Sequence, residues 1–303
     1  MGGQAVIEGV MMRAPHSYAV AVRQPSGNLR VISRSLNRPA EKHRWLGWPV
    51  LRGLGVLGQS LVVGIWALRY SAEQAMENPE PAEARPSGKS EMSRWVLALN
   101  VALSLGFFIA FYKFLPLYMA TLVSRHYRAA KNIFVFNLLD GLLRLALFFG
   151  FLALISQMKD IQRVFEYHGA EHKVVWAYER RGKLDVEAAR ACSRFHPRCG
   201  TSFLLVVMVV ALIFYLFLPF HSFAGRLAAR IALLPVIVGV SYEFIRYAAK
   251  AKGRIWKIAS APGLWLQRIT TREPDTGQLE TAIRALESAL ELEKQQGGDL
   301  VVA

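Results

Sequence analysis

The sequence is poor in cysteine and begins without a recognisable signal peptide. Cys192 and Cys199 are the only cysteines in 303 residues, too few for the disulfide framework of a small secreted protein. The first residues, MGGQAVIEGVMMR, contain neither a basic segment nor an apolar core, so we expect the N-terminus to lie in the cytoplasm. In that reducing compartment, thiolates more often bind metal or take part in chemistry than form disulfides.

Acidic residues are also scarce: 22 of them stand against 37 lysines and arginines, and the formal net charge is +15. The excess is uneven. From Glu273 onward there are seven acidic and two basic residues, which leaves +20 for residues 1–272. Such a basic chain beside a membrane favours anionic lipid as a partner, with ribosomal RNA as the alternative. We expect no recognition of a specific DNA sequence.

Charge is absent altogether from the run TSFLLVVMVVALIFYLFLPF, which is long enough to cross a bilayer. Three further apolar runs have a similar character, although one of them contains Lys113 and a kink expected at Pro116. With 53% hydrophobic residues, the sequence predicts a mainly α, polytopic membrane protein. About four transmembrane helices are expected, at residues 95–123, 133–157, 201–220 and 231–245.

The N-terminal region, by contrast, mixes β-rich and marginally apolar stretches. Residues 18–36 show two β-rich runs separated by Pro-Ser-Gly-Asn, which predicts a hairpin in a small β-containing cytoplasmic region. The stretch 53–68 is rich in glycine and short for a span, so we prefer a re-entrant or interfacial helix to a crossing.

The expected organisation has six segments. They are a basic N-terminal region, a flexible linker, a first pair of transmembrane helices, a cytoplasmic His/Cys loop, a second pair of transmembrane helices and a cytoplasmic tail. Their boundaries are 1–70, 71–94, 95–157, 158–200, 201–247 and 248–303.

Two charged residues lie one turn apart inside the run 133–157. Asp140 and Arg144 could mark a polar pathway or a substrate contact within the membrane. We prefer a self-neutralising pair that faces the interior of the helix bundle.

The C-terminal tail contains an amphipathic helix. Four apolar side chains repeat at i, i+4, i+7 and i+11 on one face: Leu279, Ile283, Leu286 and Leu290. Asp275 and Gln278 can form a variant of the capping box at its start. The apolar stripe must be buried, either on the protein's own cytoplasmic domain or on a protein partner.

The segment EYHGAEHKVVWAYE, residues 166–179, carries the most specific chemical pattern. On a helix, His168 and His172 lie one turn apart on one face, with Glu171 beside them. His-x-x-Glu-His is the inverted zinc-protease pattern, in which two imidazoles hold a metal and the carboxylate acts as general base. The alternative is an interfacial helix whose histidines merely face polar neighbours.

The loop before residues 201–220 supplies further ligands. ACSRFHPRCGTSF contains His196 and Cys199, and imidazole with thiolate is a favoured ligand set for zinc. The predicted ligands of a divalent metal, most readily zinc, are His168, His172, His196 and Cys199. Glu171 is the predicted base, and Cys192 is expected to pack as a small apolar residue. Three ligands and an open position would make such a site catalytic, whereas four would make it structural.

Four separated segments of the sequence are distinctive: GGQAVIEGVMMR, EYHGAEHK, FHPRCGTSFLL and PGLWLQRITTREPDTGQLETAI. Together they resemble the YqhQ-like family of bacterial membrane proteins, over most of the chain apart from the linker 71–94 and the extreme C-terminus. The resemblance implies a multi-spanning membrane protein with a domain of unknown function, often labelled a metal-dependent enzyme. It implies no substrate.

Two functions of different classes are therefore expected. The first is a metal-dependent, hydrolase-like membrane enzyme with its site at the cytoplasmic face. The alternative is a non-enzymatic assembly or scaffold factor that binds the translocation channel, the ribosome or anionic lipid, with a structural His/Cys cluster. In either case we expect the bacterial inner membrane, both termini in the cytoplasm and only residues 124–132 and 221–230 outside.

Overall fold

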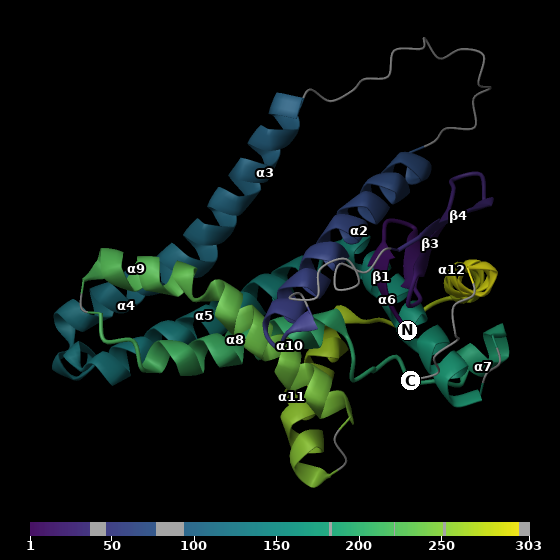
Figure 1. The fold of residues 1–303 in the computed structure, drawn as a ribbon. Coiled ribbons are helices and arrows are strands. Elements are labelled where there is room, and N and C mark those ends of the chain that lie inside the picture. Colours follow the sequence, from purple (N-terminus) through teal and green to yellow (C-terminus); the bar gives the residue numbers. More distant parts are fainter. Residues whose placement is uncertain (37–46, 77–93, 182–183, 221, 251–252, 297–303) are drawn as a thin grey trace. The chain divides into compact units, whose positions relative to one another are not determined.

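The computed structural model describes residues 1–36, 47–76, 94–181, 184–220, 222–250 and 253–296 (Figure 1). It confirms a mainly helical protein with a small antiparallel sheet near the N-terminus. The chain forms two compact units. Unit 1 comprises residues 1–79, 153–206 and 238–303, and unit 2 comprises residues 80–152 and 207–237.

Unit 1 is built on a four-stranded sheet in which each strand pairs with the next: β1 (Gly2–Val6), β2 (Gly9–Arg13), β3 (Ser17–Arg23) and β4 (Leu29–Ser35). The hairpin of β3 and β4 confirms the prediction for residues 18–36. The sequence does not predict β1 and β2, because short strands with several glycines give a weak β signal. One of these glycines is required by packing, since a Cβ on Gly9 would lie 2.2 Å from the carbonyl oxygen of Ala21.

Helices cover both faces of this sheet, so that unit 1 has three layers (Figure 1). α6 (Lys159–Arg181) and α12 (Thr276–Gln295) pack on one face, and α2 (Leu51–Ala75) packs on the other. Side chains alternate accordingly along β2: Met12 joins the core with α6 and α12, whereas Met11 joins the core with α2. The sheet thus fixes α6, the helix that carries the His-x-x-Glu-His pattern.

The C-terminal amphipathic helix is present as α12 and packs on the protein itself. Its four-residue apolar stripe is buried in the core shared with α6 and the sheet. The expected capping box also forms: the Asp275 carboxylate accepts from the Gln278 backbone N–H at 2.7 Å, and the Gln278 side chain accepts from the Asp275 N–H at 2.9 Å. Of the two expected places for the stripe, the structure therefore shows the protein's own domain.

The stretch 53–68 belongs to α2, whose 25 residues are long and apolar enough to cross a membrane. Val63 and Ala67 face the sheet, whereas Leu61 and Ile65 on the opposite side are exposed. An open sheet is not tolerated in hydrocarbon, because its edge strands would leave backbone polar groups without partners. The sheet that packs along α2 therefore favours the interfacial location expected from the sequence over a crossing.

The helices that contribute to unit 2 are α3 (Arg94–Ile109), α4 (Leu115–His126), α5 (Ile133–Ile155), α8 (Gly200–Leu216), α9 (Phe223–Ala232) and α10 (Leu234–Lys250). Residues 102–126 and α5 are each long enough to span, and α9 with α10 makes a fourth candidate, bent by 45°. With α2, the described residues thus contain three such helices, or four if the bent pair is one span. The predicted span at 201–220 is shorter than expected, because α8 ends at Leu216.

The expected linker, residues 71–94, falls mostly outside the described part of the chain. α2 continues to Ala75, five residues into that segment, and α3 begins at Arg94. The remaining positions, 77–93, are not among the described residues.

The expected pair inside α5 forms, and a second arginine joins it. Arg144 donates to Asp140 at 2.9 Å, and both side chains are buried. Arg230 of α9 lies 2.9 Å from the other oxygen of the same carboxylate. The predicted pair in the interior of the bundle is therefore confirmed, and α9 adds a second cation, Arg230, which the sequence did not predict.

The buried carboxylate of Glu293 links the end of α12 to the start of β3 by hydrogen bonds. Glu293 accepts hydrogen bonds from the His16 backbone N–H at 2.8 Å and the Ser17 hydroxyl at 2.9 Å. Burial alone would raise the pKa of Glu293, but these hydrogen bonds and the His16 ring outweigh it and lower the pKa. A lowered pKa stabilises the fold above the ordinary carboxyl pKa, and this stabilisation is lost as the pH falls through the folded-state pKa.

We therefore predict that Glu293→Gln lowers stability by about 2 kcal/mol at pH 7, because charge-assisted hydrogen bonds become neutral ones. The difference from wild type should shrink below pH 4. Thermal unfolding of the detergent-solubilised protein between pH 3 and 7 measures it. Glu291→Gln, on an exposed position of the same helix, is the control and should behave as wild type. An equal pH dependence in wild type and Glu293→Gln would contradict the assignment.

Candidate metal centre

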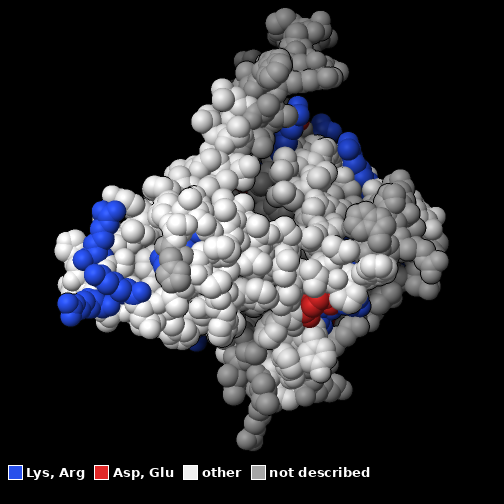
Figure 2. Space-filling view, turned by 60° about the vertical axis from the view of Figure 1, so that its left-hand side comes forward, with Lys and Arg blue, Asp and Glu red and all other residues white. Residues whose placement is uncertain are grey.

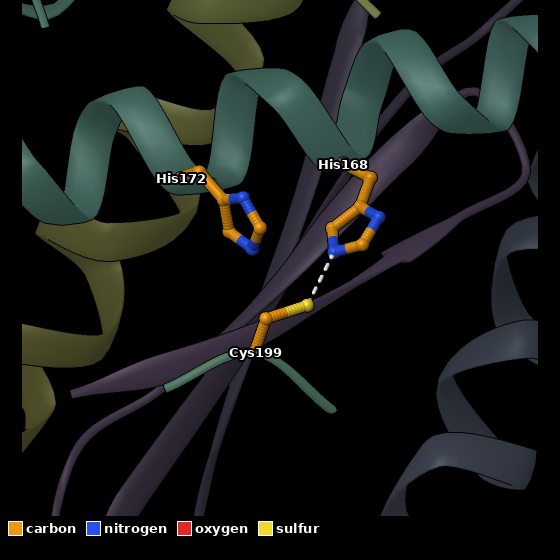
Figure 3. Close-up of side chains that lie close together, drawn as sticks. All are labelled: His168, His172 and Cys199. Carbon is orange, nitrogen blue, oxygen red and sulfur yellow. Dashed lines mark hydrogen bonds between the residues drawn. The ribbon is translucent and has the colours of Figure 1, made fainter. Parts of the chain in front are cut away.

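Two histidines of α6 and a cysteine from the loop before α8 converge in unit 1 (Figure 3). The rings of His168 and His172 are one helical turn apart, with centroids separated by 4.5 Å. Cys199 faces them, and its Sγ lies 3.2 Å from Nε2 of His168. One nitrogen or sulfur atom from each residue lies within 4.8 Å of the other two. Zinc binds such atoms at ~2.0–2.3 Å, so one ion can reach all three after a small contraction.

Backbone carbonyls orient both imidazoles. Nδ1 of His168 lies 2.8 Å from the carbonyl oxygen of Thr270, and Nδ1 of His172 lies 2.6 Å from that of Arg194. A carbonyl only accepts, so each Nδ1 must carry the hydrogen. Each Nε2 then keeps its lone pair for the space in front of Cys199. Metal-binding histidines are typically held in this way by a partner of their other nitrogen.

The Nε2 atom of His172 is the strongest sign that a ligand is needed. It is buried, and it has no hydrogen-bond partner among the described residues. Burial lowers the pKa of His172, because the charged imidazolium is disfavoured away from water, and the nearby Cys199 thiol offsets this only in part. The ring is therefore neutral, with a desolvated lone pair. Buried polar atoms without partners are rare in native proteins and require an explanation, which a bound metal ion would supply.

Gly169 permits the contact that orients His168. A Cβ at this position would lie only 2.0 Å from the carbonyl oxygen of Arg272, closer than any side chain tolerates. The backbone N–H of Arg272 donates to the carbonyl of Phe165 at 2.9 Å, which holds the segment after α11 (Arg254–Thr270) against α6. Only glycine lets this segment approach, and the approach brings the Thr270 carbonyl to His168.

The loop that carries Cys199 is held from both sides. Trp176 of α6 donates from Nε1 to the carbonyl of Phe195 at 2.8 Å, and Arg194 donates to the carbonyl of Thr271 at 2.8 Å. The loop is therefore a fixed part of the site, as a preorganised ligand set requires. Cys192, in the same loop, is buried in the core with α12 and donates to the carbonyl of Ala188, which confirms the expectation that it packs as a small residue.

Glu171, the predicted base, is not part of the three-atom group. Its side chain is buried against β1, where a Cβ on Gly3 would meet its Cδ at 2.9 Å. Burial raises the pKa of Glu171 to about 7, while the attraction of His168 and a hydrogen bond from the Gly3 backbone N–H act in the opposite direction. The structure thus gives a carboxyl group next to the candidate ligands that changes its charge near neutral pH.

His196, predicted as the fourth ligand, lies beside the group but has other partners. Its ring centroid is 5.7 Å from that of His172. Its Nδ1 accepts from the backbone N–H of Arg198 at 3.3 Å, and its Nε2 lies 3.5 Å from a carboxylate oxygen of Glu179. The structure therefore brings together three of the four predicted ligands, with both nitrogens of the fourth engaged elsewhere.

Several residues that shape the site could not be identified from residue type. Thr270 and Arg194 act through backbone carbonyls, and Gly3 and Gly169 act by lacking a side chain. Their position in the chain could have identified them, because all four lie in or beside the distinctive segments noted in the sequence. Glu8 and Arg13, the two charged residues of the distinctive N-terminal segment, have other partners: Glu8 pairs with Arg163, and Arg13 donates to Ser60 of α2.

Comparison with known proteins places the chain in a family. A family model described as "Protein of unknown function (DUF1385)" matches residues 48–292, more than half of the chain. The chain belongs to this family. It is also 33% identical over 301 residues to the uncharacterized protein YqhQ of Bacillus subtilis (strain 168), across 96% of this chain and 92% of that protein. This confirms the resemblance to YqhQ.

No solved structure matches the chain. Neither of the two matching descriptions names a reaction, a ligand or a partner. The chemical function must therefore be argued from the geometry of this chain.

We predict that Gly169→Ala destabilises the protein by about 1–3 kcal/mol, because the new methyl group must displace the backbone at Arg272. The displacement should also weaken metal binding, since it moves the Thr270 carbonyl away from His168. Thermal unfolding and metal content measure the two effects. Gly150→Ala, on a helix position where a Cβ meets nothing within 4 Å, is the matched control and should be neutral or slightly stabilising. Wild-type metal content in Gly169→Ala would contradict this account.

Proposed function

We propose that this protein is a metal-dependent membrane enzyme of hydrolase type, with His168, His172 and Cys199 as the metal ligands. The observation that carries the proposal is the buried Nε2 of His172, which lacks a hydrogen-bond partner among the described residues and lies close to two further ligand atoms. Two neutral imidazoles and a thiolate suit zinc better than magnesium or calcium, which prefer oxygen ligands.

The number of ligands favours catalysis over a structural role. Structural zinc sites usually have four protein ligands, whereas catalytic sites have three and leave one position open. His196, the fourth expected ligand, is engaged with Glu179 and Arg198. A divalent metal with an open position supplies a Lewis acid that polarises a carbonyl or phosphoryl oxygen and activates water.

Glu171 is the proposed proton acceptor. A general base works best when its pKa lies near the working pH, and the pKa of this carboxyl is raised to about 7 by burial. It lies one residue before His172 on the buried side of α6. His168 is partly exposed and so marks the side from which a substrate can approach.

The site is proposed to face the cytoplasm of a bacterial cell, with the protein in the inner membrane. The apolar helices are compatible with a membrane protein. Cys199 must stay reduced to act as a thiolate ligand, which the cytoplasm provides. The basic excess of residues 1–272 agrees with this side of the membrane.

Purified wild-type protein is predicted to contain close to one equivalent of zinc. His172→Ala and Cys199→Ser should each reduce this to below about a tenth of an equivalent, because a ligand is lost from a tightly held site. His126→Ala is the control, since His126 is an exposed histidine of unit 2. His196→Gln should also retain the metal. Elemental analysis decides the matter: a wild-type content below about a tenth of an equivalent would refute the metal site.

Glu171→Gln separates an enzyme from a scaffold. The variant should keep its metal and its fold, because glutamine has nearly the same shape and its amide oxygen still accepts from Gly3. In cells that lack the gene, the variant should fail to restore the wild-type phenotype, because the proton acceptor is gone.

Full restoration by Glu171→Gln would favour the alternative, a non-enzymatic factor that binds the translocation channel, the ribosome or anionic lipid. Deleting α12 is not a useful test of that alternative, because the helix belongs to the core of unit 1.

A further inference from the structure

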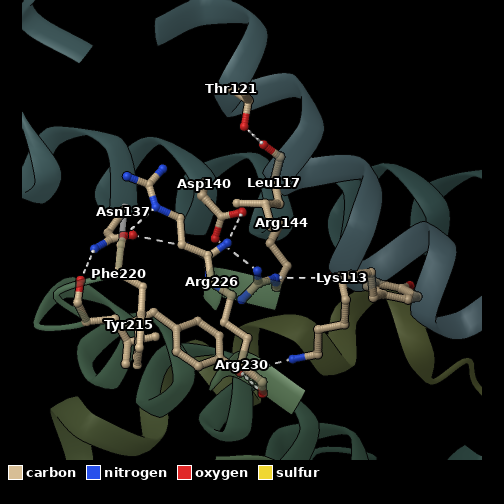
Figure 4. Close-up of polar contacts among 12 residues, drawn as sticks. Lys113, Leu117, Thr121, Asn137, Asp140, Arg144, Tyr215, Phe220, Arg226 and Arg230 are labelled. Carbon is tan, nitrogen blue, oxygen red and sulfur yellow. Dashed lines mark hydrogen bonds and ion pairs between the residues drawn. The ribbon is translucent and has the colours of Figure 1, made fainter. Parts of the chain in front are cut away.

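Unit 2 contains a second polar cluster, independent of the candidate metal centre. Its buried members are Lys113, Asn137, Asp140, Arg144, Tyr215, Arg226 and Arg230 (Figure 4). Asp140 receives contacts from Arg144 and Arg230, each at 2.9 Å. Arg230 also donates to Asn137 at 3.0 Å. Charged side chains inside a membrane-spanning bundle are costly and usually mark function.

The bend in the first span creates part of this cluster. Pro116 has no N–H to donate to the carbonyl of Tyr112, four residues earlier. Arg144 donates to this carbonyl from Nε at 3.0 Å. The π-helical turn before Pro116 also contains Lys113, whose Nζ donates to the Tyr215 hydroxyl at 3.1 Å. The kink therefore brings a second basic residue into the bundle.

The charges of the cluster do not balance. Among the described residues it contains four basic side chains, Lys113, Arg144, Arg226 and Arg230, and one carboxylate, Asp140. Nη1 of Arg144 and Nε of Arg230 are buried without a hydrogen-bond partner in the described part of the chain. A bound anion would offset such an excess of buried positive charge.

A pocket of about 210 Å³ lies at the edge of the cluster. Its lining includes the basic residues Arg226 and Lys131 and the hydroxyl residues Thr121 and Ser124. Its volume is below the ~300–1,000 Å³ of pockets for drug-sized ligands, so it suits a small anionic group. Lys131 is exposed at the mouth, whereas Arg226 is only 8% exposed.

Arg226 joins the pocket to the cluster. It lies one helical turn before Arg230 on α9, and its Nε donates to the carbonyl of Phe220 at 2.7 Å. Its guanidinium carbon lies 3.6 Å from the centroid of the Phe136 ring. No described carboxylate lies within ion-pair distance of Arg226. A buried guanidinium that is held at Nε and lacks a carboxylate is suited to bind an anion through its outer nitrogens.

The end of unit 2 that carries this pocket has the composition of a membrane–water interface. Tyr118 and Tyr127 are exposed there. Arg125 lies in the last turn of α4, and Arg128 and Lys131 lie between α4 and α5. Tyrosine and basic residues are enriched at the level of lipid headgroups. Figure 2 shows one group of basic side chains at the left edge and another at the upper right, with few charged side chains on the broad face between them.

We propose that the Arg226–Lys131 pocket binds the phosphate group of an anionic phospholipid. Lys131 contacts the phosphate from the solvent side and Arg226 from the buried side. The same phosphate chemistry would also admit a soluble phosphate compound, so the experiment must separate the two sources.

The test uses full-length protein stripped of lipid in neutral detergent. Its thermal shift is measured against added phosphatidylglycerol, phosphatidylcholine and inorganic phosphate. Phosphatidylglycerol should stabilise the wild type, and phosphatidylcholine should not. Lys131→Gln should weaken the apparent affinity for phosphatidylglycerol about tenfold, as expected for the loss of one charged contact. This variant changes an exposed residue and should fold normally.

Arg128→Gln is the matched control, because it removes the same charge from the same stretch without lining the pocket. It should change the apparent affinity less than twofold. If both variants weakened the affinity for phosphatidylglycerol equally, the effect would be one of general surface charge, and the assignment of the binding site to the pocket would be wrong. Equal stabilisation by phosphatidylcholine would overturn the anionic specificity. Stabilisation by inorganic phosphate alone, without any by phosphatidylglycerol, would overturn the lipid as the source.

Discussion

The contact between α6 and the backbone after α11 is the constraint on which the candidate metal centre depends. Gly169 lets the chain at Arg272 approach the helix, and the hydrogen bond from Arg272 to Phe165 holds it there. The carbonyl of Thr270 then fixes the tautomer and orientation of His168. A few residues further on, the capping box at Asp275 starts α12, whose buried stripe completes the core around α6. Ligand orientation and fold stability thus share one contact.

The two polar clusters differ in the kind of ligand that they would suit. In unit 1, two imidazoles and a cysteine present lone pairs, which suit a cation. In unit 2, guanidinium and ammonium groups exceed the carboxylates, which suits an anion. Each cluster contains buried polar atoms without a partner in the described part of the chain, and these atoms are what a ligand would satisfy.

Local periodicity accounts for what the sequence predicted correctly. The four-residue spacing of His168 and His172 sets their shared face, and the stripe from Leu279 to Leu290 and the capping box follow the same helical repeat. Cys199 was chosen because thiolate is a good zinc ligand, and the structure places its Sγ 3.2 Å from His168. These inferences need only residue type and spacing over one or two turns.

Long-range packing accounts for what the sequence did not predict. His196 has the chemistry of a ligand, but Glu179, seventeen residues earlier, is its partner. The sequence placed Arg226 and Arg230 in a short connection outside the membrane. Only the fold shows that both lie on a helix, α9, with buried side chains. β1 was missed because its glycines weaken the strand signal, whereas Gly3 is required by the close approach of Met11 and of Glu171 of α6.

X-ray absorption at the metal edge of the purified protein tests the central claim most directly, because it reports the atoms bound to the ion. The account predicts one sulfur at ~2.3 Å, two imidazole nitrogens at ~2.0–2.1 Å and one further light atom that is not imidazole. A shell without sulfur, or one with a third imidazole, would contradict the assignment of His168, His172 and Cys199 as the complete set of protein ligands.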